Sequence, residues 1–184
     1  MIIYIHGFGS SGEGSKAKIL RELLEDEGFI APSLSYVPAL AINTLKELIE
    51  SYSKFENVYL MGSSLGGYYA LYLADLYKIK AVLINPSVSP TRTLEKVLGE
   101  QENYYDSSKF EWNKAHLRSL EQFEVKNPQV DRYLLLSQKG DETLNYVDAL
   151  QKLYGCKKCI EEGGSHSFDG IGRYIADIED FFEE

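Results

Sequence analysis

Residues 58–74 read VYLMGSSLGGYYALYLA, and the rest of the chain is organised around this stretch. It begins as a short apolar run that ends at Gly62, as expected for a buried strand. It continues as an almost wholly apolar segment that predicts a buried helix. Between them lies a G-x-S-x-G pattern, which is typical of a tight strand-to-helix turn that presents a serine nucleophile.

Ser64 is the serine that this pattern selects. The backbone at such a turn is strained, so the residues two positions away must be small. Gly62 and Gly66, which form the predicted nucleophile elbow, meet this need, whereas a frame centred on Ser63 would need glycine where Met61 stands. Because so short a pattern also occurs by chance, a glycine-rich turn without chemistry is the alternative.

Composition limits the classes of protein that fit. The chain has 184 residues, enough for a single domain, 1–184, that buries about 70% of its unfolded surface. A net charge of −9 argues against nucleic acid and anionic membranes as partners. Two cysteines favour a reducing compartment. The N-terminal residues do not resemble a signal peptide, and no run approaches the roughly 20 apolar residues of a membrane span. We therefore expect a cytoplasmic protein and leave its oligomeric state open.

Short apolar runs alternate with amphipathic segments along the chain. Strands are predicted at 2–5, 31–36, 58–62, 80–84, 132–137 and 156–160. Helices are predicted at 15–27, from a capping box at 44–47 onward, after 64, at 145–154 and at 171–182. This alternation predicts an α/β fold with about six parallel strands in a doubly wound sheet. Right-handed crossovers would place the first strand between the second and the third, so that His6-Gly7 and Ser63-Ser64 meet at one edge.

The segment 91–127 interrupts the alternation. It shows no strand pattern, and we predict helices at 94–98 and 114–123 joined by a loop. So long an insertion is more than a connector and fits a helical cap over a site. Tyr105, Phe110 and Trp112 would then line the substrate pocket. The alternative is a plain crossover helix with an aromatic inner face.

A serine hydroxyl needs a base within hydrogen-bond reach, and histidine suits this role near neutral pH. His166 lies in a loop after the last strand, at the same edge of the sheet as Ser64, and we choose it as the base. His6 directly follows the first strand, on the other side of the turn from any acid. His116 is expected on a solvated helix face. A loop histidine that caps the last helix is the alternative for His166.

The base needs an orienting acid that precedes it in the chain and lies at the end of a strand. Asp141 follows the strand at 132–137 and is the first choice, with Glu142 as the fallback. Asp141 could instead only cap the following helix. Asp169 is too close in sequence to His166 and is expected to cap the final helix.

Two backbone N–H groups should stabilise the negative charge that develops on the former carbonyl oxygen. The pattern predicts that Leu65, the residue after the serine, supplies one. The loop after the first strand supplies the other, from Phe8 or Gly9. No metal or cofactor is expected. Cys156-x-x-Cys159 has no second cysteine pair, and residues three apart in a strand point to opposite faces, so we interpret both as ordinary thiols.

The stretches 3–11, 62–69, 81–86, 134–142 and 163–168 resemble an α/β-hydrolase, and more narrowly the small bacterial YqiA-like esterases. The resemblance implies one compact hydrolase domain that lacks the first two strands of larger members. It implies a triad of Ser64, Asp141 and His166, and activity on short acyl or acyl-CoA esters. The middle segment, 91–127, matches least.

The sequence therefore predicts a serine hydrolase that cleaves small carboxylic esters or thioesters through an acyl-enzyme. A peptidase or an acyltransferase with the same triad is one alternative. A non-catalytic binding domain that keeps the fold is the other.

Overall fold

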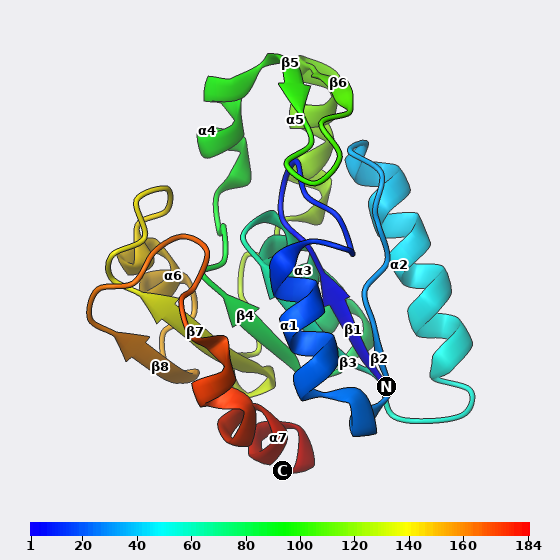
Figure 1. Ribbon diagram of the computed structural model, residues 1–184, viewed down its shortest axis with the longest axis vertical. Coiled ribbons are helices and arrows are strands. Elements are labelled where there is room, and N and C mark those ends of the chain that lie inside the picture. The colour runs from blue at the N-terminus through cyan, green and yellow to red at the C-terminus, as the bar shows by residue number, and fades with distance from the viewer.

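Six strands form one parallel sheet in the order β2-β1-β3-β4-β7-β8 (Figure 1). The computed structural model describes residues 1–25 and 27–184. The strands are β1 (Ile2–Ile5), β2 (Phe29–Ile30), β3 (Tyr59–Ser63), β4 (Ala81–Ile84), β7 (Tyr133–Gln138) and β8 (Lys157–Glu161). The predicted doubly wound sheet is confirmed, with β1 between β2 and β3.

The register brings the ends of the central strands to one edge. Ile5 of β1 is opposite Gly62 of β3, and Ser63 is opposite Ile84 of β4. Ile84 is in turn opposite Leu136 of β7. The loops that follow these strands therefore start side by side, and they carry every predicted polar site residue except His166, which follows β8.

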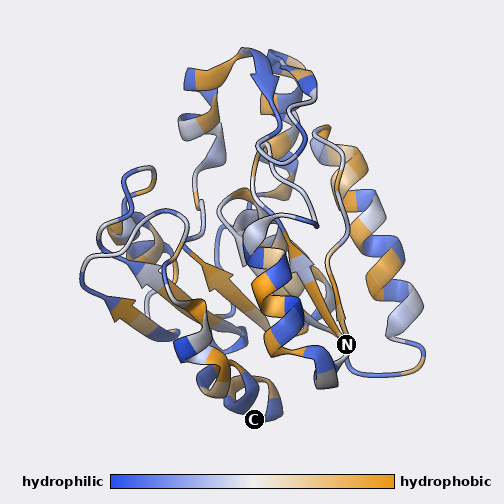
Figure 2. Ribbon diagram, in the orientation of Figure 1, coloured by the Kyte–Doolittle hydropathy of each residue, from blue (hydrophilic) through white to orange (hydrophobic). Residues whose placement is uncertain are grey.

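Helices cover both faces of the sheet. One face packs against α1 (Ser15–Leu23), the 3-10 turn η5 (Ile171–Tyr174) and α7 (Ile175–Glu183). The other packs against α2 (Pro38–Tyr52), α3 (Leu65–Tyr77), α5 (Lys114–Leu120) and α6 (Tyr146–Lys152). Figure 2 shows the central strands as the most continuously hydrophobic part of the chain. Fully burying one aliphatic side chain stabilises the fold by about 1.5–3 kcal/mol, so these strands anchor the site edge.

Alternate strand residues divide between the two faces. Ile3 and Ile5 of β1 join the cluster with α2 and α3, whereas Ile2 and Tyr4 join the cluster with α1 and α7. This is the two-residue period expected of a strand buried on both faces.

Three predicted boundaries were wrong. The second strand covers Phe29–Ile30 and not 31–36, because Pro32 has no N–H to donate to a ladder and the Leu34 N–H donates to His6 Nε2 instead. Helix α2 begins at Pro38, whose fixed φ suits a first helical position, so the capping box at 44–47 lies inside the helix. Helix α1 ends at Leu23 and is followed by the turn η1 (Glu25–Glu27).

The segment 91–127 contains strands, contrary to prediction. After α4 (Pro90–Leu94) and η2 (Glu95–Val97) come β5 (Gly99–Glu102) and β6 (Lys109–Trp112), which pair as an antiparallel hairpin. The helical part at 114–123 is confirmed as α5 followed by η3 (Glu121–Phe123), and η4 (Val130–Arg132) leads into β7. Strand β5 reads GEQE, which has no apolar alternation that would mark it as a strand.

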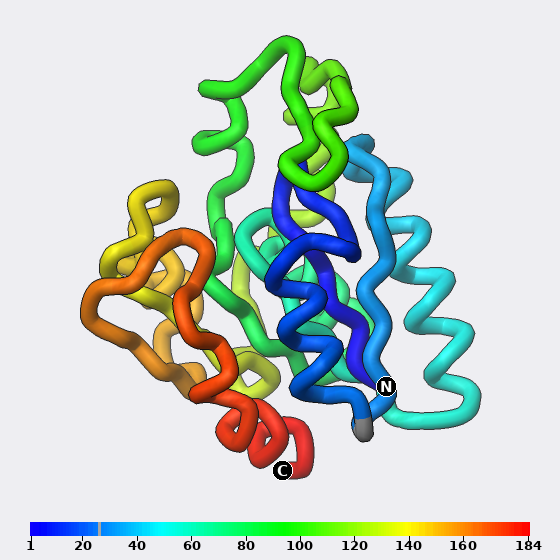
Figure 3. The backbone as a smooth tube through the Cα atoms, in the orientation of Figure 1, coloured from blue at the N-terminus to red at the C-terminus, as the bar shows by residue number. Residues whose placement is uncertain are grey.

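The hairpin is attached to the loop that follows β1, and Figure 3 shows these two segments side by side. The Tyr104 N–H donates to the Gly9 carbonyl at 2.7 Å, and Asn103 Nδ2 donates to the Ser10 carbonyl at 3.0 Å. The hairpin is therefore fixed over the edge of the sheet at which β1 and β3 end. In the described part of the chain, no helix is long and apolar enough to cross a membrane.

Candidate active site

Ser64 occupies a strained turn between β3 and α3. Its φ is 56° and its ψ is −120°, outside the regions that L-residues favour. A Cβ on Gly66 would lie 2.0 Å from the Ile5 carbonyl oxygen, and one on Gly62 would lie 2.2 Å from the Gly66 carbonyl oxygen. The expected need for small residues on both sides of Ser64 is confirmed. Strain of this kind costs about 1–3 kcal/mol and is characteristic of functional sites.

His166 lies in the loop after β8, and its ring contacts two other predicted residues. Nε2 is 3.0 Å from Ser64 Oγ, and Nδ1 is 2.8 Å from Asp141 Oδ2. Ser64 and His166 are 102 positions apart in the chain. The structure thus brings together the serine, the histidine and the first-choice acid. When Nδ1 carries the proton and donates a hydrogen bond to the Asp141 carboxylate, Nε2 is unprotonated and can accept the serine proton.

Asp141 is held as a buried carboxylate. Its side chain is only 2% exposed, and its Oδ1 accepts the backbone N–H groups of Thr143 and Leu144 at 2.8 Å each. Burial acts to raise the pKa of this carboxyl, but the hydrogen bond from His166 and these two N–H groups together hold the pKa below its usual value. Helix α6 is capped by Asn145, so the alternative in which Asp141 only caps that helix is wrong.

Glu142 contacts the backbone of His166 and not its ring. Its Oε2 accepts the His166 N–H at 3.0 Å, and the residue is exposed. Glu142 therefore helps to place the loop, whereas Asp141 contacts the imidazole.

Two buried amides that were not among the predicted site residues hold the histidine loop. Asn85 Nδ2 donates to the carbonyl oxygens of Ser165 and His166 at 2.9 and 3.2 Å. Gln138 Oε1 accepts the N–H groups of Ser165 and Asp169 at 3.1 and 2.8 Å. Both amides are almost fully buried at the ends of apolar strands, where polar residues need partners, and that placement was the available signal.

The other two histidines have structural partners. His6 is buried, accepts the Leu34 N–H at Nε2 and lies with Nδ1 2.9 Å from the Gly7 carbonyl oxygen, so both ring nitrogens are used. Burial lowers the pKa of His6, which favours the neutral ring. His116 closes the capping box of α5 with Asn113. It is partly buried between aromatic rings, contrary to the expected solvated face.

Asp169 does not cap the final helix, contrary to expectation. Its carboxylate accepts the Ser165 hydroxyl at 3.1 Å, and the N-cap of η5 is Gly170. Asp169 therefore stabilises the histidine loop itself.

Leu65 and Phe8 are two of the residues predicted to donate N–H groups to the oxyanion. Within the described residues, neither N–H donates a hydrogen bond to another protein group, and both residues line the same cavity as Ser64. Gly9 does not line that cavity, and its carbonyl accepts Tyr104 N–H. Of the two predicted loop donors, Phe8 is therefore the one that lines the cavity with Ser64.

Two cavities meet at Ser64 and His166. One, of about 230 Å³, is largely apolar and includes Leu94, Val97 and Leu144. The other, of about 440 Å³, is more polar and reaches the first turn of α1 at Lys16. The two cavities beside Ser64 thus differ in polarity.

Only part of the predicted aromatic pocket lies near the site. Trp112 is fully buried and donates from Nε1 to the Leu94 carbonyl at 3.1 Å, while Tyr105 is 51% exposed and lies against Lys18. Neither residue lines either of the two cavities that contain Ser64. Tyr104, the neighbour of Tyr105, lines both cavities in its place.

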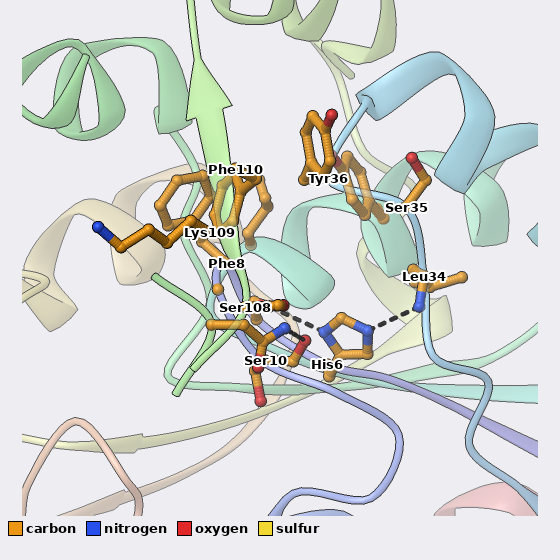
Figure 4. A pocket seen from close by; sticks show the side chains of 14 residues that line it. His6, Phe8, Ser10, Leu34, Ser35, Tyr36, Ser108, Lys109 and Phe110 are labelled. Carbon is orange, nitrogen blue, oxygen red and sulfur yellow. Dashed lines mark hydrogen bonds between the residues drawn. The ribbon is translucent and has the colours of Figure 1, made fainter. Parts of the chain in front are cut away.

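Phe110 lines a third cavity of about 270 Å³, which begins at His6 (Figure 4). Its ring stacks on Tyr36, with centroids 4.9 Å apart, and forms an edge contact with Phe8 at 5.5 Å. This aromatic cavity shares Phe8 and Leu65 with the apolar cavity at Ser64, so it extends the hairpin side of the site.

The described residues contain no group of three or more histidine, cysteine, aspartate or glutamate side chains that could hold a metal ion. Cys156 and Cys159 are unpaired thiols. They pack against opposite faces of the sheet, as predicted, and burial raises the pKa of both.

The parallel sheet, with its strained serine after β3 and its histidine loop after β8, defines an α/β-hydrolase fold. A putative hydrolase from Agrobacterium vitis S4 superposes with a TM-score of 0.78 at 20% identity, covering 98% of this chain and 87% of that one. Est1E from Butyrivibrio proteoclasticus with bound ferulic acid superposes with a TM-score of 0.73 at 17% identity, covering 99% and 86%. Likeness at this level of identity establishes the fold.

The chain belongs to the uncharacterised protein family UPF0227, which matches residues 1–183. The UPF0227 protein YcfP of Escherichia coli O9:H4 (strain HS) is 28% identical over 191 residues, covering 98% of each chain. The resemblance to YqiA-like α/β-hydrolases is confirmed by this match.

Proposed function

We propose that this protein is a serine hydrolase that cleaves carboxylic esters or thioesters through an acyl-enzyme. Ser64 Oγ attacks the acyl carbon while its proton passes to His166 Nε2. The bond to the leaving oxygen or sulfur then breaks, and the leaving group takes the proton from Nε2. Water, activated by the same imidazole, attacks the acyl-enzyme and releases the acid and free Ser64.

The continuous contact from Ser64 through His166 to Asp141 carries this proposal. The two bonds, 3.0 and 2.8 Å, lie within the distances required for a nucleophile, its base and an orienting acid. The N–H groups of Leu65 and Phe8 are proposed to bind the oxyanion. Losing one such donor typically raises the barrier by about 3 kcal/mol.

The apolar cavity supports a short acyl group. Its volume of about 230 Å³ is below the roughly 300–1,000 Å³ of typical small-molecule pockets. Est1E, which shares the fold, was solved with an aromatic acid bound, and the fold also occurs in an esterase domain from a Rhodothermus marinus protein. Both agree with a small-molecule ester as substrate.

The proposal is tested by covalent labelling with a fluorophosphonate, followed by mass spectrometry of the adduct. We expect one adduct on Ser64, which is lost in Ser64→Ala and retained in Ser51→Ala, a control on the exposed face of α2. Loss of labelling in His166→Ala but not in His116→Ala would identify the base. An unlabelled wild-type protein that also leaves 4-nitrophenyl butyrate intact would favour a non-catalytic binding domain.

A substrate series separates ester cleavage from related reactions. Butyryl esters and the butyryl thioester of coenzyme A should be turned over by the wild-type protein, and peptides should not. Product analysis with added alcohol or amine would reveal an acyltransferase, because the acyl group would then pass to the added acceptor and not to water.

A further inference from the structure

Lys16 lies in the polar cavity next to Ser64, and the proposed reaction does not use it. It is the second residue of α1, and its Nζ donates to Ser63 Oγ at 2.7 Å. An ammonium group has three donors, and within the described residues this is the one hydrogen bond that Nζ makes. No carboxylate lies within ion-pair distance of it in that part of the chain.

Burying the positive charge of a lysine costs free energy unless a negative charge or hydrogen-bond acceptors compensate for the lost water. Burial lowers the pKa of Lys16 to about 8, against the opposing effects of the negative charges of Asp141 and Asp169. Lys16 therefore stays mostly protonated at neutral pH. An uncharged side chain could fill the same space without this penalty. Within the described residues, two of the three N–H groups of Nζ have no protein acceptor, so they are available to an anion in the cavity.

The backbone around Lys16 adds to the positive potential. Helix α1 has nine residues, its N-cap is Gly14, and no side chain caps its first N–H groups. No acidic residue lies in its first turn. Gly14, Ser15 and Lys16 all line the cavity that also contains Ser64 and His166. The ammonium and the positive end of the helix dipole therefore face the same space.

Among the described residues, Glu142 is the one carboxylate that lines this cavity. Its Oε2 accepts the N–H of His166, and the residue is exposed to solvent. Glu142 and Lys16 form no ion pair in this part of the chain.

We propose that Lys16 and the first turn of α1 form an anion subsite, so that the preferred substrate is an ester or thioester whose leaving group carries a carboxylate or a similar small anion. This inference rests on the proposed function. The apolar cavity takes the hydrocarbon of the acyl group, which leaves the polar cavity for the leaving group. A protein with a net charge of −9 would otherwise repel such a substrate, so a localised cation is needed to hold it.

The test compares two matched butyryl esters. One has 4-hydroxybenzoate as its leaving group, and the other has neutral 4-hydroxybenzamide, which has the same shape. We expect Lys16→Met to lower the ratio of kcat/KM for the anionic ester over the neutral ester by about 10- to 100-fold, as for loss of a charged hydrogen bond. Lys18→Met is the matched control, because it removes the same charge from an exposed position of α1. In Lys18→Met, the ratio of kcat/KM for the anionic ester over the neutral ester should equal that of the wild type.

Equal loss of activity on both esters in Lys16→Met would overturn the inference and leave Lys16 as a structural link between α1 and Ser63. A second pair, mono-4-nitrophenyl glutarate and 4-nitrophenyl butyrate, places the anion on the acyl side. If Lys16→Met lowered the preference in kcat/KM for the anionic ester in this second pair alone, the assignment of the polar cavity to the leaving group would be overturned.

A binding measurement keeps the inference separate from the proposed function. Free 4-hydroxybenzoate should slow fluorophosphonate labelling of Ser64 in the wild type and in Lys18→Met, but not in Lys16→Met. If Ser64 is labelled and esters are cleaved without any effect of the anion, the subsite is wrong and the hydrolase proposal stands. If Ser64 is neither labelled nor active, the proposed function itself fails.

Discussion

The side-chain amide of Asn85 donates a hydrogen bond of 2.9 Å to the carbonyl oxygen of Ser165 and thereby ties the end of β4 to the loop that carries the imidazole. A second bond from the same nitrogen reaches the carbonyl oxygen of His166, and Asn85 Oδ1 accepts the Gln138 N–H at 2.9 Å. Asn85 has a φ of 40°, which asparagine tolerates better than most residues. The position of the ring therefore depends on a residue that does not touch the proposed reacting atoms.

We expect Asn85→Asp to lower kcat by about 10- to 100-fold with little change in KM. A carboxylate cannot donate to the two loop carbonyls, and the broken buried bonds should also cost about 1–3 kcal/mol of stability. Steady-state kinetics together with urea unfolding test both effects. Asn85 would have a purely structural role if the variant were less stable but retained the wild-type kcat.

Asp141→Asn should lower kcat by about 10⁴-fold, because an amide can hold the ring in the wrong tautomer. Glu142→Gln is the matched comparison, since Glu142 contacts only the backbone N–H of His166, and it should retain most of the activity. Kinetics on 4-nitrophenyl butyrate measure both variants. If Glu142→Gln lowered kcat more than Asp141→Asn did, Glu142 and not Asp141 would be the residue that orients the imidazole.

The dependence of stability on pH should also identify Asp141. Its pKa is lower in the folded state than in the unfolded chain, so the carboxylate stabilises the fold above the unfolded pKa of about 3.9. This contribution is lost as the pH falls through the folded pKa. The difference in free energy of unfolding between wild type and Asp141→Asn should therefore be largest near neutral pH and shrink below about pH 4. A constant difference would show that the pKa of Asp141 is not lowered by folding.

Gly66→Ala should destabilise the fold by about 3 kcal/mol or more, at the upper end of the cost of overpacking. The added Cβ would lie 2.0 Å from the Ile5 carbonyl oxygen and 2.6 Å from that of His6, and backbone atoms of a central strand cannot move aside cheaply. Gly99→Ala is the control, because nothing lies within 4 Å of its added Cβ and only its positive φ of 116° is unfavourable. Urea unfolding should show a smaller loss for the control, about 1–3 kcal/mol from backbone strain alone. If both variants lost a similar free energy of unfolding, the backbone around Gly66 would have moved to accommodate the added Cβ.

Local sequence patterns were enough to predict the parallel sheet, the neighbours of its first strand and the turn at Ser64. These features depend on local causes, namely the period of buried residues and the close approach that only glycine allows at Gly62 and Gly66. It also selected His166 and Asp141 as partners, because loops after parallel strands share one edge. It could not choose firmly between Asp141 and Glu142, which are neighbours in one turn.

Long-range contacts in the folded chain determine which acid faces the ring of His166, how its loop is held and where Lys16 points. Each of these depends on contacts between segments far apart in the chain. The β5–β6 hairpin was missed because β5 reads GEQE and has no apolar alternation, although Phe110 and Trp112 alternate with charged residues in β6. The hairpin is held by Asn103 and Tyr104 against the loop after β1. Local patterns record burial and backbone sterics, whereas pairings of polar groups across the fold leave no periodic signal in the sequence.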